Sequence, residues 1–133
     1  MDRSEPTVFV VDDDEAVCES LRLLIEGAGF RVETFCSAEE FLEAYEPGVP
    51  GCLVVDVRMP GMNGLELSAE LTKRRANLST IVITGHGDVP IAVQAVKTGA
   101  INFLEKPFDD EVLLEDIRRA IAADAGARRA SDE

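Results

Sequence analysis

Short apolar runs alternate along this chain with longer stretches in which apolar residues recur at helical spacing. Strands are predicted at residues 8–11, 31–35, 52–55, 80–83 and 101–104. Helices are predicted at 15–26, 38–45, 65–74, 89–98 and 111–123. A strand followed by a helix, five times in succession, predicts a parallel sheet covered by helices on both faces.

The strand runs are apolar throughout, as in Val-Phe-Val-Val at 8–11 and Leu-Val-Val at 53–55. Strands that are buried on both faces have this composition. We therefore expect an α/β fold, a flavodoxin-like doubly wound (βα)5 domain with a parallel sheet of strand order 2-1-3-4-5. Residues 1–123 form this domain. The polar, alanine-rich residues 124–133 are expected to be a frayed helix end or the start of a linker to an output domain.

Cap and turn residues bound several of the predicted helices. Asp14 precedes the first helix, Ser37 the second and Asp109 the fifth, and each carries an oxygen that accepts hydrogen bonds from free backbone N–H groups. Gly29 follows the first helix and Gly99 the fourth. The boundaries predicted from caps and from periodicity therefore agree.

The charge balance narrows the choice of partners. The 133 residues include 26 acidic and 13 basic side chains, for a net charge of −13. Such a domain repels nucleic acid phosphates and anionic lipid, so we expect it to contact neither nucleic acid nor membrane. No apolar run approaches the roughly 20 residues that span a bilayer, and the first residues lack the features of a signal peptide. We expect a cytoplasmic protein.

The cysteines fit the same compartment. The cysteines are odd in number and far apart in sequence, and each lies beside apolar residues; they are Cys18, Cys36 and Cys52. They are expected to be small core residues in a reducing environment, because no spacing among them indicates a disulfide framework or a zinc site.

Three acidic residues stand where predicted strands end. Asp12 and Asp13 follow the first strand and Asp56 follows the third. In a sheet of order 2-1-3-4-5 these two strands are neighbours, and ligands bind beyond their carboxyl ends. Clustered carboxylates repel one another until protons or a cation offset their charge. Magnesium suits such a site, and the chain lacks the alternating oxygen ligands of a calcium loop.

Two further polar residues follow later strands. Thr84 ends the fourth strand region and Lys106 follows the fifth, so both are expected at the same edge of the sheet as the acids. Taken singly, a threonine there is more often a turn residue and a lysine more often a solvated charge. Their convergence with the carboxylates at one edge of the predicted sheet is what makes them candidate site residues.

Four motifs occur in an order that resembles response-regulator receiver domains, most closely the FixJ-like branch. They are Val-Val-Asp-Asp-Asp at 10–14, Val-Asp-Val-Arg-Met-Pro-Gly-Met-Asn-Gly at 55–64, Thr-Gly-His-Gly-Asp at 84–88 and Lys-Pro-Phe at 106–108. The resemblance extends from about residue 7 to residue 121. It implies a signalling domain that accepts a phosphoryl group from a sensor histidine kinase and is no enzyme beyond its own phosphorylation and dephosphorylation.

The resemblance also implies roles for individual residues. Asp56 is the phosphoacceptor. Asp13, Asp56 and the backbone carbonyl of Arg58 hold Mg²⁺, and Asp12 acts nearby through water. Thr84 donates its hydroxyl to a phosphoryl oxygen. Lys106 pairs with another phosphoryl oxygen. It is placed there by the Lys106–Pro107 peptide bond, which is cis in the family.

The resemblance implies that two residues adjust how long the acyl phosphate on Asp56 lasts. It implies that a third residue changes its orientation when that acyl phosphate forms. Arg58 and His86 lie at variable positions on the rim of the site. Phe103 replaces a switching aromatic that is often tyrosine, so the ring remains but the hydroxyl is lost.

The predicted helix at 89–98 is more apolar than one core-facing stripe requires. A few exposed small apolar residues need no partner. By resemblance, however, phosphorylation remodels the face made by this helix and the fifth strand. Two receivers then pair through it and control a transcriptional output, with Val93 near the centre and Lys97 at the rim.

Two alternatives remain open at this stage. A magnesium-dependent aspartyl phosphatase needs a second acid two residues after its nucleophile, where this chain has Arg58. A receiver-like module that is never phosphorylated would not need the complete set formed by Asp12, Asp13, Asp56, Thr84 and Lys106.

Overall fold

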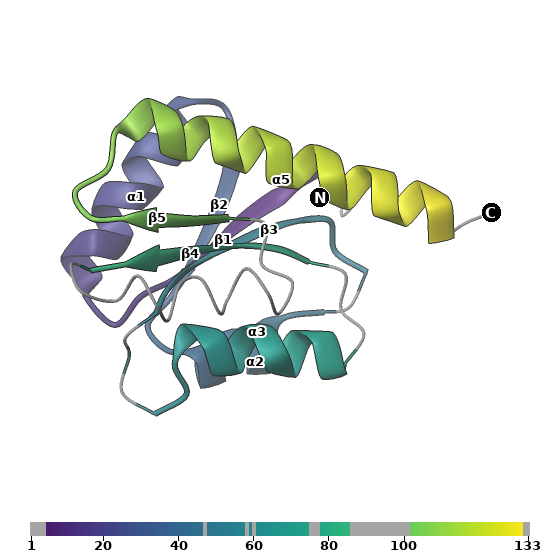
Figure 1. Cartoon of the computed structure of the whole chain (residues 1–133), viewed down its shortest axis with the longest axis horizontal. Coiled ribbons are helices and arrows are strands. Elements are labelled where there is room, and N and C mark those ends of the chain that lie inside the picture. Colours follow the sequence, from purple (N-terminus) through teal and green to yellow (C-terminus); the bar gives the residue numbers. More distant parts are fainter. Residues whose placement is uncertain are drawn as a thin grey trace.

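The computed structural model describes residues 5–46, 48–57, 59, 61–74, 78–85 and 102–131. Five parallel strands form one sheet in the order β2-β1-β3-β4-β5 (Figure 1). Their bounds are β1 Thr7–Val11, β2 Arg31–Phe35, β3 Gly51–Asp56, β4 Ser79–Thr84 and β5 Asn102–Glu105. The predicted fold class and strand order are confirmed, and each strand lies within two residues of its predicted position.

Helices cover both faces of this sheet. They are α1 (Glu15–Gly27), α2 (Ala38–Ala44), α3 (Gly64–Lys73) and α5 (Asp110–Ser131). Figure 1 shows α1 and α5 on one face and α2 and α3 on the other. The helix predicted at 89–98 lies outside the described residues.

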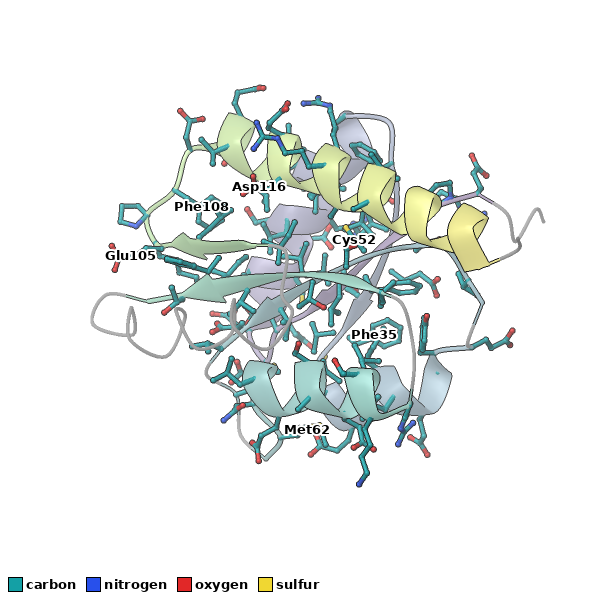
Figure 2. All side chains as sticks on the ribbon, turned by 45° about the vertical axis from the view of Figure 1, so that its right-hand side comes forward. Phe35, Cys52, Met62, Glu105, Phe108 and Asp116 are labelled. Atoms are coloured by element: carbon teal, nitrogen blue, oxygen red, sulfur yellow. The ribbon has the colours of Figure 1, made fainter. Side chains whose placement is uncertain are left out.

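Two hydrophobic cores follow from this layering, one on each face. On the α2 and α3 face, Phe41 lies at the centre of an aromatic group, with its ring 5.4 Å from both Phe9 and Phe35 in edge-to-face geometry. On the α1 and α5 face, Cys52 packs with aliphatic side chains of both helices. Figure 2 shows Phe35 and Cys52 on opposite sides of the sheet. Strands β1 and β3 need apolar residues at successive positions because both of their faces are buried.

The predicted caps define the helix starts. The side chain of Asp14 accepts hydrogen bonds from the N–H groups of Ala16 and Val17. Ser37 accepts one from the N–H of Glu40, and Asp109 accepts one from the N–H of Glu111. A reciprocal capping box between Asn63 and Glu66 opens α3 and was not anticipated. Each such cap stabilises a helix by about 1 kcal/mol.

The prediction for the cysteines is wrong at one position. Cys18 and Cys52 are buried, but Cys36 is exposed. It follows Phe35, the last residue of β2, which is an edge strand of the sheet, so an apolar neighbour in sequence does not ensure burial there.

Helix α5 is longer than the predicted 111–123 and continues to Ser131. Alanine has the highest helix propensity, and the single Gly126 in this stretch costs only about 1 kcal/mol, so the helix persists where large apolar residues have ended. The assignment of 124–133 to a frayed helix end or the start of a linker stays a prediction. Among the described residues, no helix has the length and apolar character needed to cross a membrane.

Candidate functional site

Three carboxylates meet at the carboxyl edge of the sheet. Val11 of β1 pairs with Val55 of β3, so the next residues, Asp12 and Asp56, lie side by side. With Asp13 they form a group in which one carboxylate oxygen from each residue lies within 4.8 Å of the others. Asp12 is buried, Asp56 is half-buried and Asp13 is exposed. The group is therefore open to solvent on one side and enclosed on the other.

The backbone of Asp12 is fixed by its neighbours. Its N–H donates to the carbonyl of Phe35 at 3.1 Å, which extends the pairing of β1 with β2 by one residue. Its carbonyl accepts from Sγ of Cys18 at 3.3 Å. Burial raises the pKa of that thiol to about 11, so Cys18 remains a protonated donor. The start of α1 thus holds the end of β1 in place.

Burial and a neighbouring negative charge both disfavour the ionised form of the Asp12 carboxyl group. Burial raises its pKa from 3.8 to about 6, and the negative charge of Asp56 contributes in the same direction. Its Oδ1 accepts from the N–H of Asp14 at 2.9 Å, and the charge of Lys106 lies nearby; both lower the pKa. The rise that remains comes mainly from burial of the carboxyl group, and the negative charge of Asp56 adds to it.

Lys106 supplies positive charge to this group. Its Nζ lies 3.5 Å from Oδ2 of Asp56, across 50 residues of sequence. Its N–H donates to the carbonyl of Thr84 at 2.8 Å, which ties the end of β5 to the end of β4. The peptide bond between Lys106 and Pro107 is cis. The Lys106 ammonium group therefore pairs with Asp56, one of the three clustered carboxylates.

Thr84 and Phe103 lie on the neighbouring strands. Ile83 pairs with Asp56, so Thr84 is one residue further along β4, and it is fully buried. Its Oγ1 donates to the carbonyl of Gly85 at 3.2 Å. Phe103 pairs with Val82, is half-buried and packs against the core on the α2 and α3 face.

The structure thus brings together Asp12, Asp13, Asp56 and Lys106, with Thr84 at the adjacent strand end. The other predicted residues, Arg58, His86, Val93 and Lys97, lie outside the described residues, and the predictions for them remain predictions.

One site-shaping residue was missed. A Cβ added to Gly64 would lie 2.6 Å from the backbone oxygen of Asp56, closer than atoms can approach, and the N–H of Gly64 donates to the carbonyl of Val57 at 3.3 Å. Only glycine lets the first turn of α3 approach the backbone of Asp56 this closely. The glycine was visible in the motif at 55–64, but its contact depends on how the loop closes.

Comparisons with known proteins agree with this geometry. Residues 8–118 match the response regulator receiver domain family. Transcriptional regulatory protein FixJ of Azorhizobium caulinodans is 51% identical over 125 residues, which cover 94% of this chain and 59% of FixJ. FixJ of Rhizobium meliloti is 50% identical over 131 residues, covering 95% of this chain and 64% of FixJ. The chain therefore spans less than two thirds of the length of these curated relatives.

Solved structures give the same result. The crystal structure of FixJ-N superposes with a TM-score of 0.83 at 50% identity, covering 89% of this chain and 94% of FixJ-N. The low-resolution structure of the response regulator StyR superposes with a TM-score of 0.91 at 50% identity, covering 96% of this chain and 65% of StyR. The chain belongs to the response regulator receiver domain family. Within that family, it lies in the FixJ-like branch.

Membership has two general consequences. Receiver domains interact with sensor kinases as parts of two-component systems, and they generally bind Mg²⁺ at an acidic pocket. This chain has a matching set of hard oxygen ligands in Asp12, Asp13 and Asp56. Asp12 and Asp56 also carry like charges close together, and a cation would offset their repulsion. The residues present fit magnesium.

Proposed function

We propose that this chain accepts a phosphoryl group on Asp56 from a sensor histidine kinase in the cytoplasm. The observation that supports this most directly is the setting of the Asp56 carboxylate. It is half-buried at the end of β3, among the acids Asp12 and Asp13, with Nζ of Lys106 at 3.5 Å. A nucleophilic oxygen is thus held beside a fixed positive charge that stabilises the charge of an arriving phosphoryl group.

The transfer is a single displacement at phosphorus. An oxygen of Asp56 forms the new P–O bond while the P–N bond to the kinase histidine breaks. The histidine nitrogen leaves with the electron pair and the acyl phosphate remains on Asp56. Lys106 offsets the charge of one phosphoryl oxygen, and Thr84 donates its hydroxyl to another after leaving the carbonyl of Gly85.

Residues of the same edge would hold magnesium. We assign Asp13, Asp56 and the backbone carbonyl of Arg58 as direct ligands, with Asp12 acting through water. When bound, Mg²⁺ supplies charge neutralisation for the carboxylates and for the phosphoryl oxygens. Asp12 provides part of the negative charge that attracts the ion, because it is buried beside Asp56.

Acetyl phosphate tests the proposal against both alternatives. With Mg²⁺, the chain is expected to gain the mass of one phosphoryl group on Asp56, measured by intact mass spectrometry and located by peptide mapping. An aspartyl phosphatase would release many equivalents of inorganic phosphate for each chain. A module that is never phosphorylated would neither gain mass nor release phosphate. Either of the last two results overturns the proposal.

Two contacts to the phosphoryl group are sufficient to switch the domain. Reversing a two-state population from 1:99 to 99:1 requires about 5.5 kcal/mol, and one charge-assisted hydrogen bond contributes about 1.5–3 kcal/mol. Thr84 and Lys106 together supply about the required amount. We propose that the movement of Thr84 toward the phosphoryl group lets Phe103 turn inward and changes the surface next to β5.

This surface is the proposed dimer face, with Val93 at its centre and Lys97 at its rim. Beryllium fluoride, a phosphoryl mimic, with Mg²⁺ is expected to convert the chain from monomer to dimer in sedimentation at tens of micromolar concentration. Val93→Asp is expected to remain monomeric, because a buried unpaired charge opposes pairing. If the mimic leaves the parent monomeric, or Val93→Asp dimerises equally well, the assigned face is wrong.

The output is proposed to be transcriptional. The FixJ relatives are named transcriptional regulatory proteins, and the chain covers 59% and 64% of their lengths. With a net charge of −13, this domain itself is not expected to contact nucleic acid.

A further inference from the structure

The loop that follows Asp56 makes a contact with α2 that the site described so far does not use. The carboxylate of Glu39, in the first turn of α2, accepts from the N–H of Met62 at 3.1 Å. The same carboxylate lies 3.0 Å from where a Cβ would stand at Gly61, whose φ is +73°. Figure 2 shows Met62 on the side of the sheet where α2 and α3 pack. A charged side chain 23 residues away in sequence thus holds this loop.

The ends of the loop are fixed by other means. At its start, the N–H of Val57 donates to the carbonyl of Ile83 at 2.9 Å, which continues the pairing of β3 with β4. At its end, Asn63 caps α3, and Gly64 packs against the backbone of Asp56. The Glu39 contact falls next to the second of these points, directly before the cap. Together with the cap and with Gly64, it therefore holds the point at which the chain leaving Asp56 enters α3.

We infer that Glu39 is a positioning residue for the magnesium site, an inference that rests on the proposed function. The loop carries Arg58, whose backbone carbonyl is one of the proposed ligands. A carboxylate bound to a backbone N–H forms a charge-assisted hydrogen bond, stronger than one between neutral groups. Contacts outside the direct ligands orient those ligands and alter metal affinity. Glu39 acts on the ion through the loop, without binding it.

The chain offers a matched control in the adjacent residue. Glu40 lies on the same helix, is also exposed and carries the same charge. Its backbone N–H donates to Oγ of Ser37, a bond that substitution of its side chain retains. Glu40→Ala therefore removes one negative charge from α2 while leaving the bond to Met62. A difference in Mg²⁺ affinity between the two alanine variants therefore reports the hydrogen bond of Glu39 to Met62 and not the loss of one negative charge.

Magnesium titration by calorimetry on the unphosphorylated chain is the first measurement. Glu39→Ala is expected to bind Mg²⁺ about fivefold more weakly than the parent, the effect of one lost hydrogen bond. Glu40→Ala is expected to stay within about twofold, as for an exposed charge. Glu39→Gln keeps an oxygen that can accept from Met62 and is expected to recover most of the affinity.

The amide signal of Met62 in two-dimensional NMR is the second measurement, and it needs no metal. Glu39→Ala should shift this signal and speed its hydrogen exchange, whereas Glu40→Ala should leave both unchanged. Equal Mg²⁺ affinity in the two alanine variants, or an unaffected Met62 amide in Glu39→Ala, overturns the inference while the proposed function stands. Failure of the parent to bind Mg²⁺ overturns both.

Discussion

Asp56→Asn is expected to abolish incorporation of a phosphoryl group from acetyl phosphate, the largest effect foreseen for any single substitution. An amide of the same shape lacks the carboxylate oxygen that forms the P–O bond. Intact mass after incubation with Mg²⁺ measures the result. Asp110→Asn, the same change at an exposed position on α5, is the control and should label like the parent. Full labelling of Asp56→Asn would disprove the assignment of the phosphoacceptor.

Thr84→Ala and Lys106→Ala should behave differently from Asp56→Asn. Their proposed role is to bind the phosphoryl oxygens after transfer, so we expect both variants to become labelled but to lose the dimerisation induced by phosphorylation. Each removes one of the two contacts, about 1.5–3 kcal/mol out of about 5.5 kcal/mol. If either variant is labelled and dimerises like the parent, the substituted residue has no role in the switch.

Magnesium is expected to stabilise the chain strongly at pH 7.5 and weakly at pH 5. The pKa of Asp12 is raised from 3.8 to about 6, so between these values the folded chain retains a proton that the unfolded chain has lost. The stability that this proton provides is fully present below pH 3.8 and is lost as the pH rises through about 6. Mg²⁺ competes with the same proton, so its affinity should rise across this range.

Thermal melting with and without magnesium at the two pH values measures the effect. At ten times the dissociation constant, a ligand stabilises by about 1.4 kcal/mol, which raises the melting temperature of a domain of this size by roughly 4–8 °C. Asp13→Ala removes a proposed ligand and should largely abolish the shift at pH 7.5. An equal shift at both pH values would show that Mg²⁺ does not compete with a proton on Asp12.

Most of the fold was predictable because its strands lie between two layers of helices. Burial on both faces requires consecutive apolar residues, so β1 and β3 could be located from composition alone, and caps such as Asp14 and Ser37 marked where helices begin. At the edge strands of the sheet, apolar residues in the sequence predict burial less well. Cys36 is exposed although it follows the apolar Phe35, because β2 has a partner strand on one side only.

The acidic site was predictable in its members and unpredictable in its detail. Parallel strands end at one edge, which is sufficient to bring Asp12, Asp13 and Asp56 together. Sequence does not show that Asp12 is buried while its neighbour Asp13 is exposed, yet this burial is what raises the pKa of Asp12. The contact of Glu39 joins two separate elements and leaves no periodic signal in the sequence.

The length of α5 has a mechanical consequence. The helix begins four residues after Lys106, beside the acidic site, and its 22 residues extend about 33 Å. Among residues 110–123, whose side chains the structure describes, the buried ones all belong to the first half of the helix, and Figure 1 shows the second half projecting past the sheet. A tilt of about 5° at its first turn would displace its last turn by about 3 Å. A small rearrangement beside Lys106 therefore displaces the end of this helix further than its start.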